Sequence, residues 1–185
     1  MRLYRVFPWD PEAAAQKEGG PLYVPRKHQG SQRHDIPNLD GVIYCSSVSL
    51  SAVVEGLSQF SGTFLENEDL VTPTGAVQAL VEYELDDTVT LLNLDDPHIL
   101  IQYNARPSEV ITRVYSGTRK LSEKLWQEGA PGFMWPSSHE ASWPNVTLFE
   151  SRILGKLRVV KNGIRALNTS QQEVIDACSH LRIKI

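Results

Sequence analysis

Three side chains that can bind or polarise a ligand follow one another closely in this sequence, namely Arg33, Tyr44 and Glu55. A planar guanidinium binds phosphate oxygens in a bidentate way that an ammonium cannot. A tyrosine offers an aromatic face for stacking and a hydroxyl for a hydrogen bond. A carboxylate can stabilise positive charge that develops in a transition state. One compact segment therefore presents an anion-binding group, an aromatic ring and a carboxylate.

The elements that must position these groups read as a loop, a strand and a helix. Arg33 lies in a loop from Gly30 to Asp35, and the short apolar run Val42 to Cys45 has strand character. Ser49 is predicted to be the N-cap of a helix that runs to about Phe60.

The predicted helix has one apolar stripe, formed at helical spacing by Leu50, Val53, Val54 and Leu57. Glu55 points in almost the opposite direction, so its carboxylate is not needed for packing. The plainer alternative is an ordinary solvent-facing glutamate.

Composition bounds the class of protein. The chain has 185 residues, of which 41% are hydrophobic, so it can bury one core and is predicted to form a single domain over residues 1–185. Its formal net charge is −4 and its Lys and Arg residues are scattered, which argues against a nucleic-acid binder. No apolar run has the length of a membrane span and no signal peptide is evident, so a soluble cytoplasmic protein is expected. Cys45 and Cys178 are expected to be buried thiols.

The rest of the chain alternates strands and helices without a regular βαβ period. No glycine-rich phosphate loop follows a strand, so a mixed α+β domain fits better than a Rossmann domain. Further strands are predicted at Leu3 to Phe7, Ala76 to Leu85, Thr88 to Leu92, Gly132 to Trp135, Val146 to Phe149 and Leu157 to Val160. Helices are predicted after Asp95-Asp96-Pro97, with a strand as the alternative there, from Ser116 to Glu128, and from Thr169 or Ser170 to about Leu181.

The order of several motifs resembles the RES domain, a family named for an Arg, a Glu and a Ser. The resemblance is carried by Leu3-Tyr4-Arg5-Val6, Arg33, Gly41 to Tyr44, Ala52 to Glu55, Trp135-Pro136-Ser137 and Asn145 to Phe149. These motifs span most of the chain in the family's order. The family usually has Gly before the loop arginine and Trp-Asn after it, whereas this chain has Gln32, His34 and Asp35.

RES domains are known as NAD-degrading toxins of bacterial toxin–antitoxin pairs, and they look like ADP-ribosyltransferases. The resemblance therefore implies a split, mostly antiparallel β core with flanking helices. It also implies cleavage of the nicotinamide–ribose bond of NAD⁺, which is the substrate, so no cofactor is expected. The acceptor is water or inorganic phosphate, and a helix-turn-helix antitoxin of the Xre type is the expected partner. A homodimer is left open.

The resemblance also assigns roles to single residues. Arg33 would clamp the pyrophosphate or a ribose of NAD⁺, although the loop alone favours a surface ion pair. Arg5, on an otherwise apolar strand, is the second phosphate-binding candidate. Tyr44 would stack on nicotinamide or orient a ribose, unless it is only a core residue. Glu55 would stabilise the oxocarbenium-like centre, by analogy with glycosidases.

Ser137 matches the family serine and would orient the substrate or acceptor, and the neighbouring Ser138 stays an alternative. His28, His34 and His139 lack the spacing of a zinc site, so no metal is expected. Two other functions stay open. The chain could transfer ADP-ribose to a macromolecule, or it could be an inactive NAD-binding or interaction protein.

Overall fold

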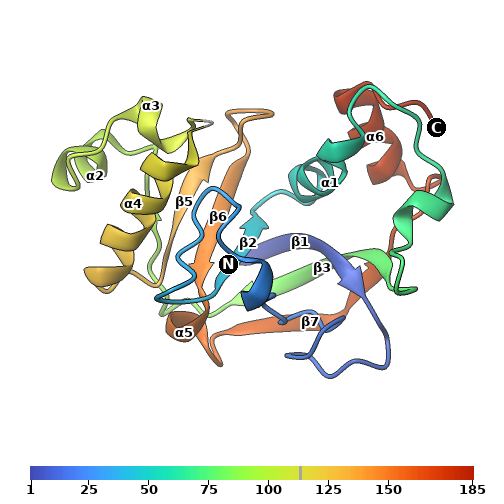
Figure 1. Ribbon diagram of the computed structural model, residues 1–185, viewed down its shortest axis with the longest axis horizontal. Coiled ribbons are helices and arrows are strands. Elements are labelled where there is room, and N and C mark those ends of the chain that lie inside the picture. The colour runs from blue at the N-terminus through green and yellow to red at the C-terminus, as the bar shows by residue number, and fades with distance from the viewer. Residues whose placement is uncertain (113) are drawn as a thin grey trace. The chain divides into compact units, whose positions relative to one another are not determined.

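The structure is a computed structural model that describes residues 1–112 and 114–185, and at His28 it describes the backbone alone. The elements in chain order are β1 (Arg2–Trp9), β2 (Val42–Ser46), α1 (Ser49–Leu57), β3 (Val77–Leu85), β4 (Leu92–Asn93), α2 (Pro97–Gln102), α3 (Pro107–Val110), α4 (Tyr115–Gln127), β5 (Gly132–Pro136), β6 (Pro144–Phe149), α5 (Glu150–Ile153), β7 (Leu157–Ala166) and α6 (Gln172–Leu181). The strand order is β4-β5-β6-β2-β1-β3-β7, with mostly antiparallel neighbours (Figure 1). This mixed sheet with flanking helices confirms the predicted α+β class.

The chain divides into two compact units, and the boundary between them falls inside β2. The first unit comprises Met1–Tyr23, Ser46–Glu84 and Arg158–Ile185. The second unit comprises Val24–Cys45 and Leu85–Leu157. That residues 1–185 form a single domain stays a prediction.

In the first unit, β1 pairs antiparallel with β3 along its whole length, from Arg2 opposite Glu84 to Trp9 opposite Val77. The predicted strand is therefore confirmed, but Pro8 does not end it. Helix α1 packs against β1 and α6 (Figure 1). Gly56 permits this close packing, because a Cβ atom there would lie 2.8 Å from the Cβ atom of Val6.

The stripe of α1 is buried as predicted at Val53, Val54 and Leu57, whereas Leu50, its fourth predicted member, is only half-buried. The predicted N-cap is wrong by one residue. Val48 occupies that position with extended backbone and no side-chain cap, so Ser49 is the first helical residue. The α-helix ends at Leu57 and continues as a 3-10 turn through Phe60.

In the second unit, β5 pairs antiparallel with β6 and parallel with β4, and β2 neighbours β6. The predicted helix at Ser116 to Glu128 is confirmed as α4, and Gly129 follows it with a φ of 88°. Asp96 caps α2 by accepting a hydrogen bond from the His98 N–H. The core of this unit contains Ile36, Val42, Leu94, Leu100, Tyr103, Val110, Leu125, Ala130, Phe133, Trp135 and Phe149.

Two predicted boundaries are wrong, and in each case a side chain holds a turn. The strand predicted at Thr88 to Leu92 is reduced to β4, because the Asp86 carboxylate accepts hydrogen bonds from the main-chain N–H and the hydroxyl of Thr88. The last helix begins only at Gln172. The Asn168 side chain accepts from the N–H and hydroxyl of Ser170, which keeps the preceding residues in a turn.

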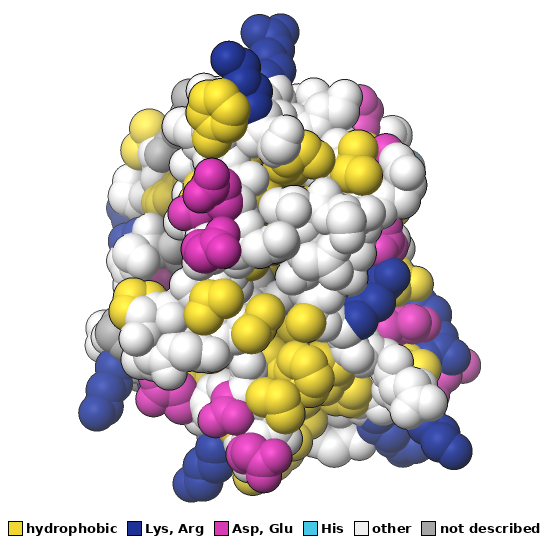
Figure 2. All heavy atoms as spheres, turned by 90° about the vertical axis from the view of Figure 1, so that its right-hand side faces the viewer, with side chains coloured by type: hydrophobic (Ala, Val, Ile, Leu, Met, Phe, Trp, Pro, Cys, Tyr) yellow, Lys and Arg dark blue, Asp and Glu magenta, His cyan; other side chains and the backbone are white. Residues whose placement is uncertain are grey.

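The side of the first unit that carries α1 and α6 has exposed apolar side chains among charged ones, as Figure 2 shows. Phe64 is 68% exposed, and the Lys184 ammonium lies 5.2 Å from the centre of its ring. A groove of about 480 Å³ lies between the end of β1 and the start of β3. No helix within the described residues is long and apolar enough to cross a membrane.

Candidate active site

The loop that carries Arg33 is closed at its base by one side chain. The Gln29 amide donates to the carbonyl of Val42 over 2.8 Å and accepts from the Val42 N–H over 3.1 Å. These two residues are 13 positions apart, so both ends of the intervening loop are held together at the start of β2. A side-chain amide can bond a main-chain N–H and C=O at once because it carries both a donor and an acceptor.

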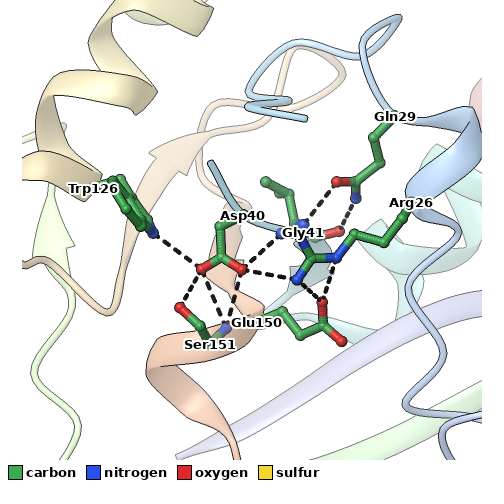
Figure 3. A network of polar contacts seen from close by, with 8 residues as sticks. Arg26, Gln29, Asp40, Gly41, Trp126, Glu150 and Ser151 are labelled. Carbon is green, nitrogen blue, oxygen red and sulfur yellow. Dashed lines mark hydrogen bonds and ion pairs between the residues drawn. The ribbon is translucent and has the colours of Figure 1, made fainter. Parts of the chain in front are cut away.

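Near the end of this loop, the buried carboxylate of Asp40 ties together three segments of the second unit (Figure 3). It accepts from the Trp126 indole N–H on α4 over 3.0 Å and from the N–H and hydroxyl of Ser151 on α5. Arg26 pairs with Asp40 at 3.3 Å and with Glu150 at 2.7 Å. Arg26 is therefore engaged in an internal network of ion pairs.

Inside the loop, Asp35 organises the backbone around Arg33. Its Oδ2 accepts hydrogen bonds from the main-chain N–H groups of Gly30 and Gln32, at 2.8 and 2.7 Å. Its Oδ1 accepts a 2.8 Å hydrogen bond from the Tyr44 hydroxyl on β2, and that hydroxyl accepts in turn from the His34 N–H. Burial, and then the Asp35 carboxylate, raise the pKa of Tyr44 far above its usual value, so the phenol stays protonated.

Arg33 is 8% exposed and lies close to two aromatic rings. Its Cζ is 5.1 Å from the ring centre of Tyr115 at the start of α4 and 5.2 Å from that of Trp135 on β5. The guanidinium donates to the carbonyl of Thr112. Among the described residues, none places a carboxylate within ion-pairing distance of Arg33, so the predicted surface ion pair is not what the structure contains. Cation–π contacts with the two rings stabilise the charge. They use none of the guanidinium N–H groups, so those not bonded to Thr112 can donate to an anionic ligand.

The neighbouring His34 is buried and uncharged. Its Nδ1 lies 2.9 Å from the hydroxyl of Thr147 on β6, and that hydroxyl accepts from the Trp135 indole N–H over 3.0 Å. Burial, and then the positive charge of Arg33, lower the pKa of His34 well below 6.5. The loop arginine is therefore the cationic group of this part of the site.

Ser137 follows Trp135 at the end of β5 and is buried, whereas Ser138 is exposed. The Ser137 main-chain N–H donates to Trp143, and its hydroxyl accepts from the N–H of His139 at 3.1 Å. The serine thus fixes the turn that follows Trp135. Three candidates lie in the second unit, namely Arg33, Tyr44 and Ser137. Tyr44 on β2 is hydrogen-bonded to the loop that carries Arg33, and Arg33 lies beside Trp135 on β5, two residues before Ser137.

The other two candidates, Glu55 and Arg5, belong to the first unit. Glu55 is half-buried on α1, on a helix whose apolar side is packed against β1 and α6. Arg5 is half-buried on β1 and donates a 3.3 Å hydrogen bond to the carbonyl of Tyr23.

Sequence reasoning missed the groups that hold Arg33. Tyr115 and Trp135 are aromatic residues far from Arg33 in the chain, and no local pattern indicated that they would flank it. Asp35 was noted only as a departure from the family pattern, although an Asp in a loop is a common acceptor for nearby main-chain N–H groups. No group of His, Cys, Asp and Glu side chains within the described residues is arranged to hold a metal ion.

No curated protein matches this chain. One chain of the crystal structure of the M. tuberculosis MbcT–MbcA toxin–antitoxin complex is similar in fold, with a TM-score of 0.64 and 17% sequence identity. The similarity covers 90% of this chain and 84% of that chain. The sequence profile of the RES domain matches residues 2–167. With nearly its whole length matched in this way, the chain belongs to the RES domain family.

Proposed function

We propose that this protein cleaves the bond between nicotinamide and ribose in NAD⁺ and passes ADP-ribose to water or inorganic phosphate. The observation that carries the proposal is the buried guanidinium of Arg33, which lies close to two aromatic rings and has no carboxylate partner among the described residues. A buried charge without a counter-ion is costly, so it is retained where a ligand supplies the opposite charge. The pyrophosphate of NAD⁺ is such a ligand, and RES family membership supports it.

The two rings restrict how Arg33 can bind. With ring centres at 5.1 and 5.2 Å from the guanidinium carbon, an anion would meet its N–H edge, where two parallel hydrogen bonds to phosphate oxygens can form. We assign to Arg33 the role of a phosphate clamp. Arg5 is the second candidate for this role, because it too has no carboxylate partner among the described residues, and its hydrogen bond goes to a neutral carbonyl.

For Glu55 we propose the role of an electrostatic stabiliser. Breaking the nicotinamide–ribose bond leaves positive charge on the ribose, and a carboxylate nearby stabilises that charge and accepts from a ribose hydroxyl. Nicotinamide leaves as a neutral group, so no metal is required. Tyr44 would offer its ring, and Ser137 or Ser138 would orient the substrate or acceptor.

In the cell, we propose that the protein is the toxin of a toxin–antitoxin pair and acts in the cytoplasm. The support is family membership and the fold similarity to a chain of a toxin–antitoxin complex. The expected partner is an antitoxin protein with a helix-turn-helix domain. Whether the protein forms a homodimer can be measured by the mass of the purified protein in solution.

One experiment tests the reaction and separates it from the alternatives. The purified protein is incubated with NAD⁺ labelled in its adenylate half, with and without inorganic phosphate, and nicotinamide release is followed. Free ADP-ribose, or its phosphate when phosphate is present, supports the proposal and identifies the acceptor. Label on protein or nucleic acid favours an ADP-ribosyltransferase, and absence of nicotinamide release eliminates the enzyme.

A further inference from the structure

The hydroxyl of Thr147 joins two rings beside Arg33. It accepts a 3.0 Å hydrogen bond from the Trp135 indole N–H and lies 2.9 Å from Nδ1 of His34. Thr147 itself is completely buried. We infer that the chain Trp135–Thr147–His34 fixes the Trp135 ring against Arg33, and that Thr147 and His34 are positioning residues of the phosphate clamp. This inference rests on the proposed function, because it identifies the residues that keep the proposed phosphate site at Arg33 rigid.

The direction of the hydrogen bonds follows from counting protons. An indole nitrogen can only donate, so the Thr147 oxygen accepts from Trp135 and its own proton is available for His34 Nδ1. The His34 ring then carries its hydrogen on Nε2. In the opposite tautomer, the Thr147 proton and the Nε2 lone pair would both lack partners among the described residues, which would cost more free energy.

The surroundings of His34 fit this tautomer. Nε2 has no oxygen or nitrogen partner in the described part of the chain. Its ring meets Phe133 and Trp135 edge to face, with centroid distances of 4.8 and 4.9 Å. These aromatic neighbours supply no hydrogen-bond donor that an Nε2 lone pair could accept from, and an N–H group beside aromatic rings is weakly favourable.

The backbone below the arginine is held independently by α4. The carbonyl of Arg33 accepts from the Thr118 hydroxyl, and the carbonyl of His34 accepts from the Ser122 hydroxyl at 2.8 Å. With the backbone fixed, the orientation of the guanidinium depends on its two ring neighbours and on its hydrogen bond to the carbonyl of Thr112. The Thr147 hydroxyl joins the Trp135 ring to His34, the residue next to Arg33. The ring beside the guanidinium is therefore linked to the loop that carries it.

The test uses the full chain with Thr147→Val, which keeps the shape of the side chain but removes the hydroxyl, and Thr147→Ser, which keeps the hydroxyl. Steady-state NAD⁺ cleavage should show a KM about tenfold higher in Thr147→Val, with kcat within about twofold, because losing the support weakens binding in the ground and transition states alike. Thr147→Ser keeps the hydroxyl and should have the KM of the wild type. Val174→Ala is the matched control, because Val174 on α6 is fully buried and its truncation should lower stability and leave KM unchanged.

A second measurement does not depend on catalysis. In the NMR spectrum, the Trp135 indole N–H should exchange slowly with solvent in the wild type and in Thr147→Ser, and fast in Thr147→Val. The nitrogen shifts of His34 should show Nδ1 unprotonated. Trp135→Phe removes the same hydrogen bond from its other end and serves if Thr147→Val does not fold; its KM should rise in the same way.

The outcomes separate this inference from the proposed function. A wild-type protein that releases no nicotinamide overturns the proposed function. The NMR measurements then test by themselves the support chain, that is, the hydrogen bonds that join Trp135, Thr147 and His34. A wild-type protein that cleaves NAD⁺, with unchanged KM and unchanged indole exchange in Thr147→Val, overturns the support chain alone. If KM rises as much in Val174→Ala as in Thr147→Val, the rise reflects lost stability, and this result also overturns the inference.

Discussion

The Tyr44 hydroxyl donates a 2.8 Å hydrogen bond to Asp35, nine positions away, and so ties the loop around Arg33 to strand β2. The same hydroxyl accepts from the main-chain N–H of His34. Its proton is therefore already used inside the protein. Of the two roles proposed for Tyr44, stacking of its ring on the substrate is the one that leaves these hydrogen bonds in place.

Changing Tyr44→Phe should separate the ring from the hydroxyl. The ring remains, but the Asp35 carboxylate and the His34 N–H each lose a partner, so the free energy of unfolding should fall by about 1–3 kcal/mol. NAD⁺ cleavage should slow, because the loop that orients Arg33 loses its tie to β2. Chemical denaturation and steady-state kinetics measure the two effects, and unchanged values for both would contradict the role of this contact.

Changing Glu55→Gln tests the electrostatic role. The substitution keeps the shape but removes the negative charge, so NAD⁺ cleavage should fall by about a hundredfold or more. Folding should persist because Glu55 lies off the apolar stripe of α1. Glu68→Gln, at an exposed position of the same unit, is the matched control and should cleave at the wild-type rate. Wild-type cleavage by Glu55→Gln would remove this residue from the site.

Changing Arg33→Lys should weaken NAD⁺ binding by about tenfold or more despite the retained charge. An ammonium has no planar fork for phosphate and cannot stack on the rings of Tyr115 and Trp135 as a planar guanidinium can. Arg33→Ala should be weaker still. Calorimetric titration with a non-hydrolysable NAD⁺ analogue measures this, with Arg165→Lys on the surface of β7 as control. Equal affinities in all four proteins would exclude the phosphate clamp.

The buried His34 should make stability depend on pH. Its pKa is lowered in the folded protein, so below about pH 6.5 the unfolded chain binds a proton that the native state does not. Stability should therefore fall as the pH drops below that value, by at most about 1.4 kcal/mol per pH unit. Urea unfolding at several pH values should show this component in the wild type and lack it in His34→Gln. Equal slopes in the two proteins would mean that His34 is charged when folded.

Toxicity should track catalysis. Induced expression of the wild-type chain in a bacterium should lower intracellular NAD⁺ before growth stops, whereas Glu55→Gln and Arg33→Ala, expressed to the same level, should do neither. The order of events matters, because a dying cell also loses NAD⁺. Growth arrest at constant NAD⁺, or equal toxicity of Glu55→Gln, would favour a mechanism based on binding a partner.

Local patterns predicted the local structure well. The apolar spacing at Val53, Val54 and Leu57 gave helix α1 with its buried side, and the strand predicted at Ala76 to Leu85 is observed as β3, which buries Val81, Tyr83 and Leu85. Such patterns predict structure well because the spacing of apolar residues depends only on which side of a helix or strand is buried.

What failed depends on contacts that a local pattern does not contain. Thr147 and His34 are 113 positions apart, so nothing near either residue indicates their hydrogen bond. The strand predicted at Leu157 to Val160 continues through Asn162 and Gly163 to Ala166, although Asn-Gly usually forms a turn. Asn162 does adopt a left-handed φ of 60°, but β3 beside it keeps the chain extended on both sides.

This irregular strand also bears on aggregation. β7 ends the strand order, and an edge strand is a template on which strands of other molecules can add. Its side chains at Arg158, Lys161 and Arg165 are exposed, and the left-handed Asn162 interrupts the regular row of main-chain donors and acceptors. A second copy that added here would crowd like charges and lose hydrogen bonds at that residue. The edge should thus resist fibril-like association even when the chain is produced at high concentration.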